Sequence, residues 1–142
     1  MFLLDTNVVS ELRRPSKADP KVLAWARSVP MIQQYVSAIT MLELEQGVLA
    51  RARSDEAQGT ILRAWLDGTV RVRFAGRIVA VDEHVALCCA YLHVPNPKSY
   101  RDALIGACAM VHGMTLVTRN IKDFDQMTDI SDRAIKLLNP WD

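Results

Sequence analysis

Short apolar runs alternate along the chain with segments whose apolar residues recur at the spacing of a helix. The short runs predict buried strands, at Phe2–Leu4, Tyr35–Ala38, Arg77–Val81, Met114–Val117 and Ala134–Leu138. Capping residues and prolines mark where helices begin between them, over Val8–Arg13, Pro20–Trp25, the segment after Thr40, Glu56–Leu66, Asp82–Leu92 and Ser99–His112. This alternation predicts an α/β fold, in which helices cover both faces of a mostly parallel sheet.

Details of the pattern give further local expectations. Thr40 is placed to cap the helix after the second predicted strand, and Glu43 follows at the spacing of a capping box. The same helix is expected to turn three apolar residues inward: Leu42, Val48 and Leu49. Asp67–Gly68 predicts a polar turn, and Gln126–Arg133 predicts an exposed loop.

Length and composition limit the kinds of protein that this chain can be. Its 142 residues suit a single domain over residues 1–142. The formal net charge of +1 gives no strong overall attraction to a polyanion, so contact with nucleic acid must depend on where Lys and Arg gather. Cys88, Cys89 and Cys108 are odd in number and lack CxxC spacing, which argues against a disulfide framework or a zinc site.

No segment has the character of a secretion signal or a membrane span. The opening MFLLDTN has neither a basic region nor a long apolar stretch. The longest apolar run, near Ala103–Val111, is far shorter than the ~18 residues that suggest a transmembrane helix. We therefore expect a cytoplasmic protein with no membrane partner.

Four acidic residues stand at predicted strand ends or near the start of a helix: Asp5, Glu43, Asp102 and Asp123. Ligands of open parallel sheets bind at the carboxyl ends of the strands, so these side chains converge if the strands concerned are neighbours. Each acid by itself also suits an ordinary role, as a helix cap, a capping-box member, a partner of a helix dipole or a turn residue.

Converging carboxylates would repel one another unless a cation lay between them. Carboxylate oxygens suit Mg²⁺ or Mn²⁺ rather than zinc, and such an ion can activate water for attack on a phosphodiester without a histidine base. The three histidines, His84, His93 and His112, lie in predicted helices or at their ends, and we expect them to have structural or surface roles.

Five stretches of sequence together resemble PIN-domain proteins of the VapBC toxin type, especially the subgroup typified by the FitB protein. They are FLLDTNVVSEL, SAITMLELEQG, RDALIGACAMVHG, LVTRNIKDF and the closing LLNPW. The resemblance covers nearly the whole chain and implies a PIN-domain-like three-layer α/β/α fold. It further implies a dimeric ribonuclease that uses Mg²⁺ or Mn²⁺, cleaves RNA and is inhibited by a small DNA-binding antitoxin. The C-terminal segment of that antitoxin is implied to cover the active groove.

The motifs of the family map onto this sequence residue by residue. The implied catalytic and metal-binding acids are Asp5 in LDTN, Glu43 in ITMLEL, Asp102 before ALI and Asp123 in TRNIKDF. The polar residues that help to order such a site match Asn7, Thr118 and Asn120.

Basic residues beside the acidic motifs are candidates for RNA binding, because contacts to phosphate supply affinity without selecting a sequence. Arg101, Arg119 and Lys122 flank the proposed site residues. Arg101 is also a departure from the family pattern, since many relatives have a small residue or proline at that place. Glu45 is an alternative acid to Glu43, but it would point to a different face of its helix.

Three other functions remain open at this point. Asp5 could be the acceptor of a phosphatase, but the second aspartate of the haloacid-dehalogenase pattern is replaced by Asn7 here. A binding module without catalysis is a second alternative, against which the four intact acids argue. The third is a PIN nuclease that processes RNA without being a toxin, and a neighbouring antitoxin gene would distinguish it.

Overall fold

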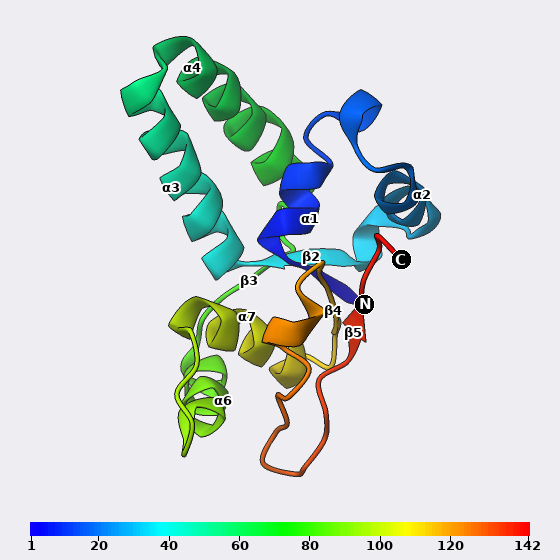
Figure 1. The fold of residues 1–142 in the computed structure, drawn as a ribbon, viewed down its shortest axis with the longest axis vertical. Coiled ribbons are helices and arrows are strands. Elements are labelled where there is room, and N and C mark those ends of the chain that lie inside the picture. The colour runs from blue at the N-terminus through cyan, green and yellow to red at the C-terminus, as the bar shows by residue number, and fades with distance from the viewer.

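The computed structural model describes residues 1–142 and has a five-stranded parallel sheet at the centre of the molecule (Figure 1). Its strands are β1 (Phe2–Leu4), β2 (Gln34–Ser37), β3 (Ile78–Val79), β4 (Thr115–Val117) and β5 (Leu137–Leu138). They lie in the order β3-β2-β1-β4-β5, and each neighbouring pair is parallel. The predicted α/β class is therefore confirmed, although β3 and β5 are shorter than the sequence pattern predicts.

Helices cover both faces of this sheet. They are α1 (Thr6–Glu11), α2 (Pro20–Ser28), α3 (Ala38–Ser54), α4 (Glu56–Trp65), α5 (Arg71–Arg73), α6 (Glu83–His93) and α7 (Tyr100–Val111). A π-helical segment covers Leu66–Val70, and 3₁₀ turns cover Pro15–Lys17, Met31–Gln33 and Ile121–Asp123. In Figure 1, α1, α2 and the α3–α4 hairpin lie above the sheet, and α6 and α7 lie below it. This is the three-layer arrangement that was expected. None of the helices is both long and apolar enough to cross a membrane.

The central strands are buried on both faces because their residues alternate between two hydrophobic cores. Leu3 and Leu116 belong to the core that includes α6 and α7, whereas Leu4 and Val117 belong to the core that includes α1 and α3. All four side chains are at most 1% exposed. Strands of this kind are continuous apolar runs in the sequence, which is why the hydrophobic pattern locates them.

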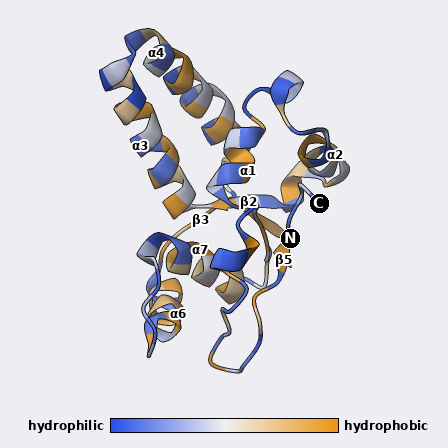
Figure 2. Cartoon of the chain, viewed as in Figure 1, coloured by the Kyte–Doolittle hydropathy of each residue, from blue (hydrophilic) through white to orange (hydrophobic).

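Helix α3 begins earlier than the sequence predicts. Ser37 rather than Thr40 is the N-cap, because the Ser37 hydroxyl accepts a 3.0 Å hydrogen bond from the Thr40 N–H. The prediction of inward side chains is correct for Val48 and wrong for Leu42 and Leu49, which are 49% and 56% exposed. Hydrophobic and hydrophilic bands alternate along α3 and α4 in Figure 2, as expected for helices with one buried face.

The sequence predicts no regular structure for two segments, and the structure confirms this for only one of them. Asp67–Gly68 is not a turn, since the chain stays helical through Leu66–Val70, and both ends of that segment are buried in the core next to α1. Gln126–Arg133 is a largely exposed loop, as predicted, apart from the buried Met127.

Candidate active site

The carboxyl ends of β1 and β4 lie next to each other in the middle of the sheet. Asp5 directly follows β1 and Thr118 directly follows β4, and the Asp5 N–H donates a 2.9 Å hydrogen bond to the Val117 carbonyl. The order of the strands reverses at this point, because β2 and β3 lie on one side of β1, and β4 and β5 on the other. Open α/β sheets bind ligands at such a position.

Asp5 is buried, with only 6% of its surface exposed. It caps α1 by accepting a 2.8 Å hydrogen bond from the Thr6 N–H at Oδ1, and the Thr118 hydroxyl donates a 2.7 Å bond to Oδ2. Burial raises the pKa of this carboxyl, the two hydrogen bonds lower it, and the carboxylates of Glu43 and Asp123 raise it further. Asp5 therefore combines the role of a helix cap with a place in an acidic cluster.

Thr118 connects the other two polar residues, Asn7 and Asn120, that were expected to order the site with it. It is fully buried, and its hydroxyl accepts hydrogen bonds from the Asn120 N–H at 3.0 Å and from Asn7 Nδ2 at 3.4 Å. The Asn7 amide also donates to Asp5 Oδ2 at 3.3 Å. A second aspartate at position 7, as in the haloacid-dehalogenase pattern, would repel Asp5 where this amide binds it.

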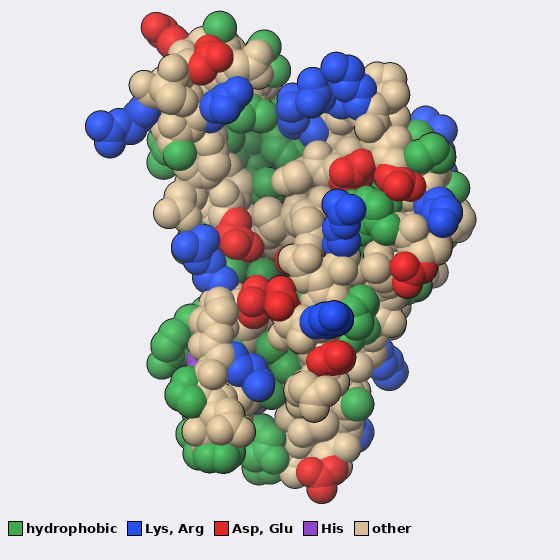
Figure 3. Space-filling view, viewed as in Figure 1, with side chains coloured by type: hydrophobic (Ala, Val, Ile, Leu, Met, Phe, Trp, Pro, Cys, Tyr) green, Lys and Arg blue, Asp and Glu red, His purple; other side chains and the backbone are tan.

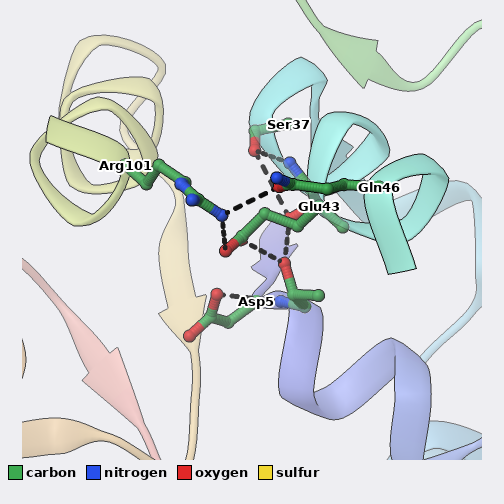
Figure 4. A network of polar contacts seen from close by, with 7 residues as sticks. Asp5, Ser37, Glu43, Gln46 and Arg101 are labelled. Atoms are coloured by element: carbon green, nitrogen blue, oxygen red, sulfur yellow. Dashed lines mark hydrogen bonds and ion pairs between the residues drawn. The ribbon is translucent and has the colours of Figure 1, made fainter. Parts of the chain in front are cut away.

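Glu43 lies in the second turn of α3, so its predicted place in a capping box is wrong. Both of its carboxylate oxygens have partners from other elements. The Thr6 hydroxyl donates a 2.7 Å hydrogen bond to Oε1, and Arg101 Nη1 lies 3.5 Å from Oε2. The same Arg101 nitrogen donates to Gln46 Oε1 at 3.3 Å. Figure 4 shows this chain of contacts, which joins α1, α3 and α7 beside Asp5.

Asp102 and Asp123 complete the acidic cluster. Asp102 lies in the first turn of α7, and Asp123 is the last residue of the 3₁₀ turn after β4. Burial raises the pKa of Asp102, and so do the carboxylates of Asp123, Asp5 and Glu43, while Arg101 lowers it. Asp5 is thus affected by two other acids of the set, Glu43 and Asp123, and Asp102 is affected by all three of the others.

The carboxylates of the acidic cluster do not converge on a single position. No three acidic, histidine or cysteine side chains lie close enough together to enclose a metal ion. The donors are nevertheless all carboxylate oxygens, and their mutual repulsion at a partly buried site is the condition that a divalent cation relieves. In chemistry these residues fit Mg²⁺ or Mn²⁺. The His93 side chain has contacts of its own: Nδ1 accepts a 3.0 Å hydrogen bond from the Lys98 N–H, and the ring packs against Tyr100 with 4.3 Å between the ring centres.

Basic side chains border the cluster. On the face shown in Figure 3, acidic side chains gather in the middle and basic side chains lie on either side of them. Lys122 is exposed in the 3₁₀ turn after β4. The Arg119 guanidinium carbon lies 5.2 Å from the centre of the Trp141 ring, a cation–π contact. Neither this contact nor the Thr6 hydroxyl was expected. Thr6 could have been found from its place in LDTN. Trp141 belongs to the closing LLNPW motif, but its contact with Arg119 depends on β5 lying next to β4.

Glu45 is held away from the acidic cluster. Its Oε1 accepts a 2.7 Å hydrogen bond from Arg63 Nη1 of α4, so Glu45 faces α4 and points away from Glu43, as helix geometry predicted. Beside Glu43, a groove of about 360 Å³ leads between α1 and the α3–α4 hairpin, and its lining includes Arg13 and Trp65.

The family of the chain follows from comparison with known proteins. The model of the PIN domain family matches residues 2–130. The chain belongs to the PIN domain family. The resemblance to PIN-domain proteins is thereby confirmed over four of the five sequence motifs, and the closing LLNPW lies beyond the matched residues.

Curated relatives match this PIN-domain chain along its whole length. "Toxin FitB" from Neisseria gonorrhoeae is 34% identical over 151 residues, which is 99% of this chain and 99% of the relative. "VapC ribonuclease Y4jK" from Sinorhizobium fredii is 32% identical over 147 residues, which is 100% of this chain and 99% of the relative. The crystal structure of FitAcB from Neisseria gonorrhoeae is similar with a TM-score of 0.84 and 33% identity, over 99% of both chains.

Proposed function

We propose that this PIN-domain chain is a metal-dependent endoribonuclease and the toxin of a type II toxin–antitoxin pair. The proposal is supported by the acidic cluster beside the carboxyl ends of β1 and β4, where acidic neighbours raise the pKa values of Asp5 and Asp102. We assign the metal to four acids: Asp5, Glu43, Asp102 and Asp123. The printed names of the full-length relatives, a toxin and a VapC ribonuclease, support both parts of the proposal.

The four acids would hold Mg²⁺ or Mn²⁺. Such an ion activates water and stabilises the charge that develops on a phosphodiester during hydrolysis. The chain itself supplies the orientation of the acids. Thr118 and Asn7 hold Oδ2 of Asp5 by hydrogen bonds of 2.7 and 3.3 Å, and the Asn120 N–H in turn holds the Thr118 hydroxyl. These bonds keep the carboxylate in one rotamer, so less ordering remains to be done when the ion binds.

RNA is the proposed substrate, and three basic side chains would bind its phosphates. Arg101 already contacts an acid of the cluster, Lys122 lies next to Asp123 in the chain, and Arg119 is steadied by Trp141. Their contacts would supply affinity rather than choice of sequence.

A small DNA-binding antitoxin is the proposed partner. The groove beside Glu43 could receive its C-terminal segment, because the groove has apolar side chains such as Trp65 and opens at the acids. We also propose a homodimer. The exposed Leu42 and Leu49 lie on one side of α3 and would be covered in such an assembly.

Cleavage of RNA by the purified chain tests the enzymatic part. Cutting should require Mg²⁺ or Mn²⁺, stop with EDTA, and be lost in Asp5→Asn. Glu43→Gln should lose activity as well, whereas Glu45→Gln removes an equal charge from the same helix and should keep it, because Glu45 faces Arg63. Equal loss in the two glutamate variants would contradict the assignment of Glu43.

Expression in a bacterial host tests the biological part. The wild-type chain alone should arrest growth, and the Asp5→Asn variant should not. Normal growth with soluble, RNA-cleaving wild-type chain would favour an RNA-processing nuclease that is not a toxin.

A further inference from the structure

Both oxygens of the Glu43 carboxylate are already bound by groups of this chain. The Thr6 hydroxyl holds Oε1 at 2.7 Å, and the Arg101 guanidinium lies 3.5 Å from Oε2. The Glu43 side chain is 26% exposed and that of Arg101 is 53% exposed, so the ion pair lies at the mouth of the site. Gln46 Oε1 accepts a 3.3 Å hydrogen bond from the same Arg101 nitrogen and helps to keep it there (Figure 4).

Arg101 is the only cationic side chain that forms an ion pair with any of the four acids. It precedes Asp102 in the first turn of α7, so one turn of helix presents an acid to the cluster and a cation to Glu43. The Asp102 carboxylate has no hydrogen bond from the protein. A guanidinium therefore occupies one acid of the cluster while a neighbouring acid is free.

We propose that Arg101 stands in for a divalent cation at Glu43 and must leave this carboxylate before the ion can bind there. This inference rests on the proposed metal-dependent function. Arg101 competes with the ion in two ways, because it occupies an oxygen of Glu43 and because its charge repels a second cation.

Departure of Arg101 has a consequence for the substrate. With the acids neutralised by a bound ion, the Arg101 guanidinium would have no anionic partner and would remain at the mouth of the site. A phosphate of RNA is an anion of the geometry that a guanidinium binds. Metal and RNA would then strengthen each other's binding through this residue, and linkage makes the effect reciprocal.

The Arg101–Glu43 ion pair is not expected to be important for the stability of the fold. A salt bridge with one partner half-exposed contributes little to folding. Replacement of Arg101 should therefore change the affinity for metal and leave the unfolding temperature nearly unchanged, which separates this role from a structural one.

Calorimetric titration of the purified, RNA-free chain with Mn²⁺ tests the inference. Arg101→Gln should bind Mn²⁺ roughly five- to tenfold more tightly than the wild type, the effect of removing one charge about 7 Å from a divalent ion in a water-like dielectric. Arg101→Lys keeps the charge and should stay within about twofold of the wild type. Arg53→Gln is the matched control, since it removes the same charge from the exposed end of α3, about three turns from Glu43.

The possible outcomes separate the inference from the function on which it rests. Unchanged or weaker Mn²⁺ binding by Arg101→Gln, with binding by the wild type intact, would overturn the inference and leave the nuclease proposal standing. Weaker binding would make Arg101 a residue that positions Glu43 for the ion. No Mn²⁺ binding by the wild type or any variant would refute the metal site itself. Binding by Arg101→Gln alone would support the competition in its strongest form.

Discussion

Asp102→Asn should stabilise the metal-free protein at neutral and alkaline pH, although it removes an acid from the proposed site. Burial and three neighbouring carboxylates disfavour the ionised form of Asp102, and no hydrogen bond from the protein compensates for them. Asparagine has nearly the same shape and no charge. The substitution therefore removes repulsion without breaking a hydrogen bond or a close ion pair.

The expected size follows from two opposing effects. Two carboxylates about 6 Å apart in a water-like dielectric repel each other by about 0.7 kcal/mol. Three such neighbours, less the attraction of Arg101, amount to about 1–2 kcal/mol. Against this, an ionised acid in the first turn of α7 gains about 0.3–1 kcal/mol from the helix dipole, which asparagine loses. A net stabilisation of about 1 kcal/mol remains.

The effect should depend on pH in one direction. Because the pKa of Asp102 is raised in the folded protein, the folded state takes up this proton at a higher pH than the unfolded chain does. The ionised carboxyl thus destabilises the fold above its folded-state pKa, and this penalty disappears as the pH falls through that pKa. The advantage of Asp102→Asn should be largest near about pH 8 and vanish in acid, where wild-type Asp102 is itself neutral.

Urea unfolding in EDTA at a series of pH values measures this difference. Glu83→Gln is the control, because it removes an exposed first-turn acid of α6 that has no acidic cluster around it, and it should be slightly destabilising. Addition of Mn²⁺ should reverse the order, since the wild type gains stability from binding. This account of the site would be refuted if Asp102→Asn were less stable than the wild type at about pH 8 without metal. It would also be refuted if the difference in stability did not change with pH.

Two further pairs of substitutions test the residues that hold Asp5 and the packing of the α3–α4 hairpin. Thr118→Val should lower the free energy of unfolding by about 1–3 kcal/mol, because the buried Asp5 loses its 2.7 Å donor, and Thr118→Ser should recover most of the loss. Gly59→Ala should destabilise by about 1–2 kcal/mol, because the added Cβ would lie 2.5 Å from the Ala52 Cα. Gly47→Ala, which meets nothing within 4 Å, should gain up to about 1 kcal/mol. Urea unfolding measures both comparisons, and equal shifts in the two glycine variants would exclude close packing of α3 on α4.

Several features of the protein were determined by the sequence alone. The strands β1 and β4 are buried on both faces, so their residues form apolar runs that any window of the sequence shows. Asp82 is the cap of α6, as predicted, because a helix N-cap is a local device that depends on a side chain and an N–H three residues away. The acids of the site lie near the ends of strands or the starts of helices, and these positions can also be found from local sequence.

Other features were decided only by the tertiary structure. Thr40 and Ser37 are both good capping residues, and the choice of Ser37 followed from where β2 ends in the sheet. The approach of Asp5 to Thr118 depends on β1 lying next to β4, which are more than a hundred residues apart in the chain. The contacts of Arg101 with Glu43 and of Arg119 with Trp141 likewise join separate elements. Local patterns record which residues are buried and where elements end, whereas partners across the fold are set by the order of the strands and the packing of the helices on them.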